Sequence, residues 1–161
     1  MKAAEERRQV LADLEERFRD AIVAIREHSP KRVYIEIRPE GLREVADYIF
    51  HTLEARFSIA SAVDTPEAIE ILYHFILERI NLLISLRVKL DREMPEVDSL
   101  AVCFPAAEWI EREIHELFGV QFRDHPDLRR LLLPEQWPEG VYPLRRDYRE
   151  WDPAAVRTRG V

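Results

Sequence analysis

Four glutamates in one short segment are the first residues whose spacing could do chemistry: Glu108, Glu111, Glu113 and Glu116, with Arg112 among them. On a helix, residues three or four apart are neighbours. Glu108 would then lie beside Glu111, Glu113 beside Glu116, and Arg112 within one turn of both Glu108 and Glu116. Three interpretations follow: a solvated charged face, a charged network buried at an interface, or an acid–base pair, which needs two groups of different pKa.

Histidine supplies little further chemistry. The five histidines are His28, His51, His74, His115 and His125, and none has the His-Glu-x-x-His spacing of a helical metal site. His74 is expected to be a half-buried, hydrogen-bonded ring in a strand. His125 precedes Pro126, so we expect it to hydrogen-bond a turn. A stand-alone acid–base enzyme using Glu113 and His115 is kept as an alternative.

Cysteine and glycine usage excludes several kinds of cofactor site. Cys103 is the only cysteine, so the chain cannot form an internal disulfide or supply the ~4 cysteine ligands that an iron–sulfur cluster typically needs. The four glycines form no phosphate-binding loop. No cofactor is expected on this chain, and a redox centre near it would belong to another chain or be held by residues other than cysteine.

Composition and charge set the class of protein. The 161 residues are 47% hydrophobic and 34% charged, which suits a globular chain with its own core. The net charge of −7 argues against nucleic acid as a partner. No apolar run approaches the ~20 residues of a membrane-spanning helix, and no secretory signal is visible, so the default location is cytoplasmic.

The hydrophobic pattern predicts an α+β fold. Apolar residues recur every three or four positions in helices and at every second position in half-buried strands. On this basis we expect helices at residues 3–27, 42–57 and from Pro105 to Gly119, a left-handed cap at Gly119, strands at 33–38, 58–63, 69–77 and 82–90, and a loop at 91–98. The last two long strands should form an antiparallel hairpin. The predicted architecture is an α/β sandwich, with amphipathic helices on one face of a small, mostly antiparallel sheet. Leu72 and Ile76 point to the other face, which we expect the helices to cover in part.

The C-terminal segment differs from the rest. Prolines divide residues 123–161 into short pieces that carry Leu131 to Leu133, Trp137, Tyr142 and Trp151. Such a segment is too apolar to lie free in water. We therefore expect an α/β domain at 1–122 and an extended arm at 123–161 that docks on a partner.

Three linked motifs carry a family resemblance: residues 111–120 (EREIHELFGV), 125–137 (HPDLRRLLLPEQW) and 142–148 (YPLRRDY). Together they resemble the 30-kilodalton subunit of NADH–quinone oxidoreductase (respiratory complex I). The same family includes the matching subunit of energy-converting, membrane-bound [NiFe] hydrogenases and formate hydrogenlyases. Glu116 stands where the family usually has aspartate, which keeps the charge.

The resemblance implies a cofactor-free, non-catalytic assembly subunit of the peripheral part of such a complex. Its partners would be the large catalytic subunit and the small Fe–S subunit, with Fe–S clusters, and in the hydrogenases a Ni–Fe site, held by those partners. It would lie on the cytoplasmic side of the membrane, which it meets only through the complex. Complex I and the hydrogenase branch both remain open. The expected interface residues are Glu111, Arg112, Glu113, Glu116, His125, Pro126, Asp127, Arg129, Arg130, Trp137, Tyr142, Arg145, Arg146 and Asp147.

Overall fold

A computed structural model describes residues 2–149 of the chain, so Trp151 of the predicted arm lies outside the described residues. The main elements are α1 (Lys2–Arg17), β1 (Ile22–Ser29), β2 (Arg32–Ile37), α2 (Leu42–Asp47), β3 (Arg56–Asp64), β4 (Ile69–Leu77), β5 (Leu82–Leu90), β6 (Glu96–Asp98), α3 (Glu108–Phe118) and β7 (Gln121–Arg123). Short helical turns join them: η1 (Pro39–Gly41), η2 (Tyr48–Thr52), η3 (Glu78–Ile80) and η4 (Pro105–Ala107).

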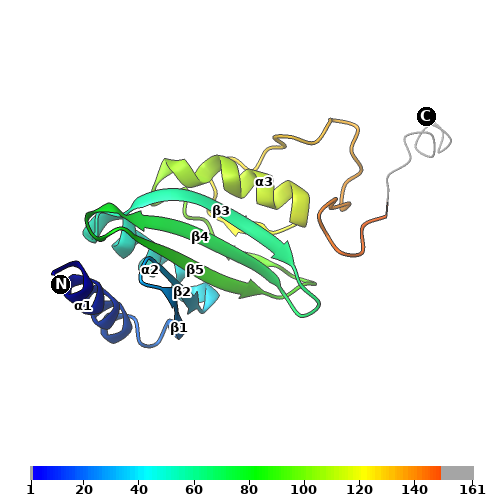
Figure 1. Ribbon diagram of the computed structural model, residues 1–161. Coiled ribbons are helices and arrows are strands. Elements are labelled where there is room, and N and C mark those ends of the chain that lie inside the picture. Colours follow the sequence, from blue (N-terminus) through cyan, green and yellow to red (C-terminus); the bar gives the residue numbers. More distant parts are fainter. Residues whose placement is uncertain (1, 150–161) are drawn as a thin grey trace, which may run out of the picture.

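The main sheet has five strands in the order β1-β2-β5-β4-β3 (Figure 1). Every neighbouring pair is antiparallel except β2–β5, which is parallel. β6 and β7 form a separate two-stranded parallel sheet. The predicted mostly antiparallel α+β architecture is confirmed.

The β4–β5 hairpin forms where the sequence predicts it. Every second residue of β4, from Ile69 to Leu77, is buried, and β5 follows nearly the same pattern. Asn81 takes the left-handed conformation (φ 51°) that lets the chain turn back, and Leu77 pairs with Leu82. Asparagine tolerates this conformation better than most residues.

The helices form one layer on one face of the sheet. Buried side chains of α1, α2 and α3 join the inward side chains of the strands in a single core. Tyr48, the first residue of η2 directly after α2, contacts α1 and the residue that follows it: its hydroxyl donates to Asp13 at 2.6 Å, and its ring packs edge-on against Phe18. The opposite face has no helix over it among residues 2–149. Leu72 and Ile76 are only half-buried there, so the expected partial cover by helices was wrong.

The first predicted helix was too long. α1 ends at Arg17, and Ile22–Ser29 is strand β1, which pairs with β2. Ile22 and Ile25 continue the helical spacing, but β-branched residues also suit strands, and pairing of Ile25 with Ile35 decides the outcome.

Two other predicted boundaries move. The second helical segment ends at Thr52 with η2, and positive φ at Glu54 (55°) precedes β3, which begins before the predicted residue 58. The predicted loop at 91–98 contains β6, a three-residue strand that only its distant partner β7 could reveal.

Candidate functional site

Helix α3 forms the centre of the site. Pro105 opens the turn before it, and Gly119 caps its end in the left-handed conformation (φ 77°), as predicted. The ring of Tyr142 lies against this cap so closely that a Cβ on Gly119 would be 2.5 Å from it. The cap therefore needs glycine both for its backbone angle and for the room that it leaves.

The buried side of α3 is only partly apolar. Ile114 and Phe118 are buried, but Trp109 is 66% exposed. Three charged residues of this helix are buried as well: Glu111, Arg112 and Glu116. For these three the solvated-face interpretation is wrong, because each must find partners inside the protein.

Arg112 binds the chain's own C-terminal segment. Its Nε donates to the carbonyl of Arg129 at 2.9 Å, and its Nη2 donates to that of Arg130 at 3.0 Å. Arg112 lies within one helical turn of Glu108 and Glu116, but the described residues show no salt bridge between it and either glutamate. The planar guanidinium thus fixes two successive peptide groups.

Glu116 holds the next three residues of the same segment. Its carboxylate accepts the backbone N–H groups of Leu131 (3.0 Å), Leu132 (2.5 Å) and Leu133 (3.3 Å). Hydrogen bonds to a charged group are stronger than neutral ones. We call Arg112, Glu116 and the backbone of 129–133 the clamp.

The segment beyond the clamp is fixed by side chains that point back to carbonyl groups. Nη1 of Arg130 donates to the carbonyls of Pro134 (2.6 Å) and Trp137 (3.1 Å). Nε1 of Trp137 in turn donates to the carbonyl of Val141 at 2.8 Å. These bonds fold residues 130–141 into a loop without helix or strand.

The end of the described chain is tied to the main domain. Arg145 donates to the carbonyls of Phe118 (2.6 Å) and Arg92 (2.7 Å). The backbone N–H of Arg146 donates to Asp64 at 2.9 Å. Asp64 also accepts both bonds of the Arg92 fork, and that guanidinium is the main cause that lowers the pKa of Asp64.

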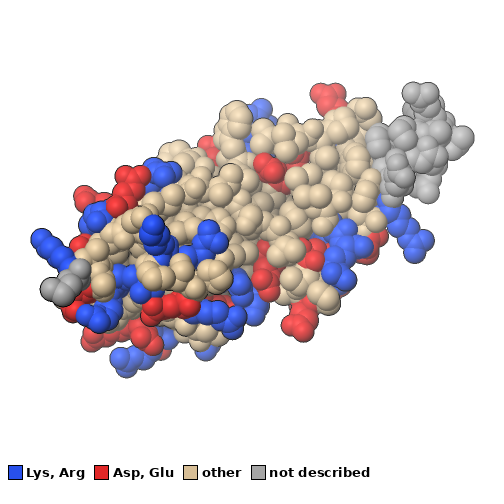
Figure 2. Space-filling model, in the orientation of Figure 1, with Lys and Arg blue, Asp and Glu red and all other residues tan. Residues whose placement is uncertain are grey.

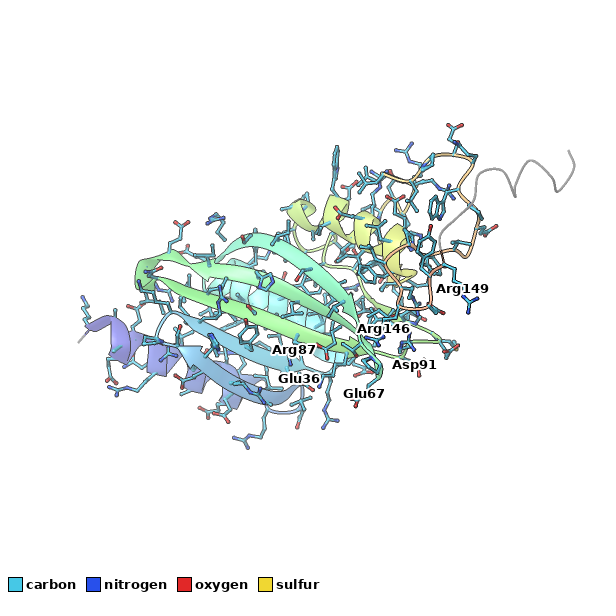
Figure 3. The ribbon with its side chains drawn as sticks, turned by 45° about the vertical axis from the view of Figure 1, so that its right-hand side comes forward. Glu36, Glu67, Arg87, Asp91, Arg146 and Arg149 are labelled. Carbon is cyan, nitrogen blue, oxygen red and sulfur yellow. The ribbon has the colours of Figure 1, made fainter. Side chains whose placement is uncertain are left out.

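Residues 124–149, which we call the C-terminal arm, thus follow α3 and return to the sheet. Figure 3 shows Arg146 and Arg149 of the arm at the end of the sheet that carries Glu67 and Asp91. Arg146 and Asp147 are exposed, as is Arg129, whose guanidinium donates three hydrogen bonds of 2.8–2.9 Å to the Asp127 carboxylate. This pairing lowers the pKa of Asp127 to about 2.

Glu111 lies in a separate buried cluster under α3. Its carboxylate accepts the Ser99 hydroxyl (2.5 Å), the N–H of Leu100 (2.8 Å) and the Tyr73 hydroxyl (3.3 Å). Burial outweighs these bonds and raises the pKa of Glu111 to about 7. Burial likewise raises the pKa of Tyr73.

His125 joins the arm to this cluster. Its side chain is fully buried, and Nε2 lies 4.0 Å from Glu111. Nδ1 accepts the N–H of Asp127 at 3.0 Å, so Nε2 carries the proton and donates to the carbonyl of Glu108 at 3.0 Å. The predicted turn-binding role of His125 is confirmed, and Pro126 forms part of that turn.

His74 is also confirmed as a hydrogen-bonded, half-buried ring, with Nδ1 2.8 Å from the Ser85 hydroxyl and Nε2 3.4 Å from the Ser61 hydroxyl.

Glu113 and His115, the residues of the alternative acid–base pair, are not brought together. His115 is hydrogen-bonded to the carbonyl of Val120, and no hydrogen bond joins it to Glu113 within residues 2–149.

The sequence therefore marked the clamp residues but not what they hold. It missed Tyr73, Ser99, Asp64 and Arg92, whose partners lie far away in the chain and leave no local pattern.

No group of three or more His, Cys, Asp or Glu side chains in the described part of the chain is arranged to hold a metal ion. Nor does that part contain a helix with the length and apolar character needed to cross a bilayer.

Known proteins are similar to this chain in sequence and in fold. A family model described as "Respiratory-chain NADH dehydrogenase, 30 Kd subunit" matches residues 35–153. One subunit of the F(420)H(2) dehydrogenase of Methanosarcina mazei is 32% identical over 144 residues, which are 88% of this chain and 90% of the relative. One subunit of the NADH-quinone oxidoreductase of Chelativorans sp. is 36% identical over 141 residues, 84% of this chain and 66% of the relative.

A solved structure supports the fold. A chain of the membrane-bound sulfane sulfur reductase, an archaeal respiratory membrane complex, matches with a TM-score of 0.75 at 21% identity, covering 96% of this chain and 91% of that one. The match of the family model over most of the chain, with the motifs of α3 and the arm inside it, decides the family. The chain belongs to the family of the 30-kilodalton subunit of respiratory-chain NADH dehydrogenase.

Proposed function

We propose that this chain is a non-catalytic subunit of a complex I-like, membrane-associated oxidoreductase, and that its C-terminal arm binds the large catalytic subunit. One observation carries the proposal: the clamp fixes an arm on which two large apolar side chains stay exposed, Leu132 at 59% and Leu144 at 53%. An arm that is ordered before binding loses less entropy when a partner covers it.

The lack of cysteine ligands on this chain supports the same role. Cys103 is the sole cysteine, so iron–sulfur clusters would lie in partners, the small Fe–S subunit among them. In the proposed complex the chain lies on the cytoplasmic side and meets the membrane arm only through its neighbours. It supports the large subunit during electron transfer coupled to ion translocation. The whole predicted interface set remains part of this proposal, including its buried members, which act by shaping the arm.

A second candidate is the equivalent subunit of an energy-converting [NiFe] hydrogenase or formate hydrogenlyase. The similarity to a subunit of an F(420)H(2) dehydrogenase favours keeping it, because relatives of this chain are then not restricted to complexes named for NADH. The two candidates differ in the large subunit, which carries a nickel site only in the hydrogenases. Metal analysis of the purified complex separates them.

The test is affinity purification of the native complex through a tag on this chain. We expect a large catalytic subunit and an Fe–S subunit to co-purify. Leu132→Asp and Leu144→Asp each place a charge in the proposed contact, and loss of about 2 kcal/mol at an anchoring side chain lowers affinity about thirtyfold. Val102→Asp is the matched control, since Val102 is 51% exposed but lies outside the arm.

The outcomes separate clearly. Loss of the large subunit with both leucine variants and its retention with Val102→Asp would support the proposal. Undiminished co-purification with both leucine variants would refute the role of the arm. A wild-type chain that purifies alone, or that carries its own redox group, would refute the assembly role altogether.

A further inference from the structure

Strand β3 is a free edge of the main sheet. It runs for nine residues, and β4 is the only strand paired with it in the described chain. The backbone groups on its outer side therefore offer a row of donors and acceptors. Such a row can pair with a further extended chain.

The central part of the edge lacks most of the usual protection. Between Arg56 and Asp64 it has no charged residue and no proline. Small side chains dominate its central stretch, namely Ser58, Ala60, Ser61 and Ala62. Ser58 and Ser61 are exposed, whereas Ala60 is buried in the core. Natural edge strands are normally blocked by charges, proline or bulges.

The other edge of the same sheet is protected, which makes it an internal comparison. β1 carries Arg26, Glu27 and His28, and its pairing with β2 is interrupted by two register shifts. β3 has one register shift, near its start at Phe57. The contrast shows that the open edge at β3 is not a general feature of this sheet.

The surface next to the β3 edge is apolar. Ile59 and Val63 are 51% and 46% exposed and, four residues apart, point to the face without helices. Helix α3 lies along β3 in the other layer, with Ile110 and Leu117 on the flank opposite the Arg112–Glu116 row. Figure 2 shows a broad surface without charged side chains over β3.

We propose that β3 accepts an extended, uncharged segment of a partner subunit as a further strand of the main sheet. Only an extended chain matches the backbone row of β3, and the absence of charge along the edge favours a segment whose alternate residues are apolar. The inference rests on the proposed function for the existence of the partner subunit. The family match favours such a partner over a second copy.

Amide hydrogen exchange tests the proposal directly. The isolated chain and the affinity-purified complex are compared by mass spectrometry of peptides covering β3 and β1. We expect alternate amides of residues 57–63 to exchange at least about tenfold more slowly in the complex, which is about 1.4 kcal/mol of added protection. The β1 amides should not change.

Edge variants give a second readout. Ile59→Lys and Val63→Lys introduce a charge at exposed positions and should remove the added protection while leaving the melting temperature of the isolated chain near that of the wild type. Val63→Thr keeps a β-branched, uncharged side chain and should retain it. Val23→Lys is the matched control on β1, because Val23 is 53% exposed on the opposite edge.

Failure of this inference can be told from failure of the proposed function. If the complex forms but β3 exchanges as fast as in the isolated chain, the added strand is refuted and the assembly role stands. If the isolated chain forms dimers with a protected β3, the edge belongs to a second copy and the inference is wrong. If no partner purifies with the wild type, the proposed function fails first.

Discussion

Glu116→Gln is the substitution that tests the clamp most sharply. The glutamate carboxylate accepts three backbone N–H groups, two of them on Oε2 and one on Oε1. Glutamine keeps the shape but has one accepting oxygen. If that oxygen faces Leu131 and Leu133, the new amide NH2 must face the N–H of Leu132, so one bond is lost and two become neutral.

The expected cost follows from these bonds. A hydrogen bond to a charged group contributes about 1.5–3 kcal/mol net, against about 1 kcal/mol for a neutral one. We take about 2 kcal/mol as the loss in the free energy of opening the arm, which speeds amide exchange at Leu131 to Leu133 about thirtyfold. The main domain should unfold almost as before, because the arm adds few side chains to its core.

The assay is hydrogen exchange of the peptide covering 129–133, with limited trypsin digestion after Arg129 and Arg130 as a second measure. Glu113→Gln is the matched control, since Glu113 lies on the same helix and its side chain makes no hydrogen bond or salt bridge in the described chain. Unchanged exchange in Glu116→Gln, or equal acceleration in Glu113→Gln, would refute the reasoning.

Two further predictions concern the free energy of unfolding. Gly119→Ala should lower it more than Gly140→Ala does, as measured by urea unfolding. Both glycines have positive φ (77° and 73°), which costs alanine about 1–2 kcal/mol, but only at Gly119 would the new Cβ also clash with the Tyr142 ring. Equal losses of stability in the two variants would show that the Tyr142 ring moves aside at no energetic cost. Burial raises the pKa of Glu111 from 4.5 to about 7. Between these two pH values the folded chain keeps a proton that the unfolded chain releases. The free energy of unfolding should therefore fall by up to about 3 kcal/mol as pH rises through this range. Urea unfolding from pH 4.5 to 7.5 should therefore show a shallower decline in Glu111→Gln than in the wild type, and parallel profiles would contradict the assignment.

The local elements of this fold were predictable from the sequence where one pattern dominated. The alternation in β4 and β5 left a single interpretation, because every second residue from Ile69 to Leu77 is apolar and Asn81 suits the turn between the strands. Gly119 was predictable for the same reason, since a glycine after an apolar helical face marks a left-handed cap. The family motifs also pointed to α3 and the arm as the site.

Tertiary contacts decided what the sequence left ambiguous. Ile22 and Ile25 fit a helix as well as a strand, and only pairing with β2 made that segment β1. Glu111, Arg112 and Glu116 have the spacing of a solvated face, yet they are buried because their partners, at Tyr73, Ser99 and residues 129–133, arrive from distant parts of the chain. Charged side chains carry no local signal of their burial: whether water or a backbone group meets them depends on chain segments that only the folded structure brings together.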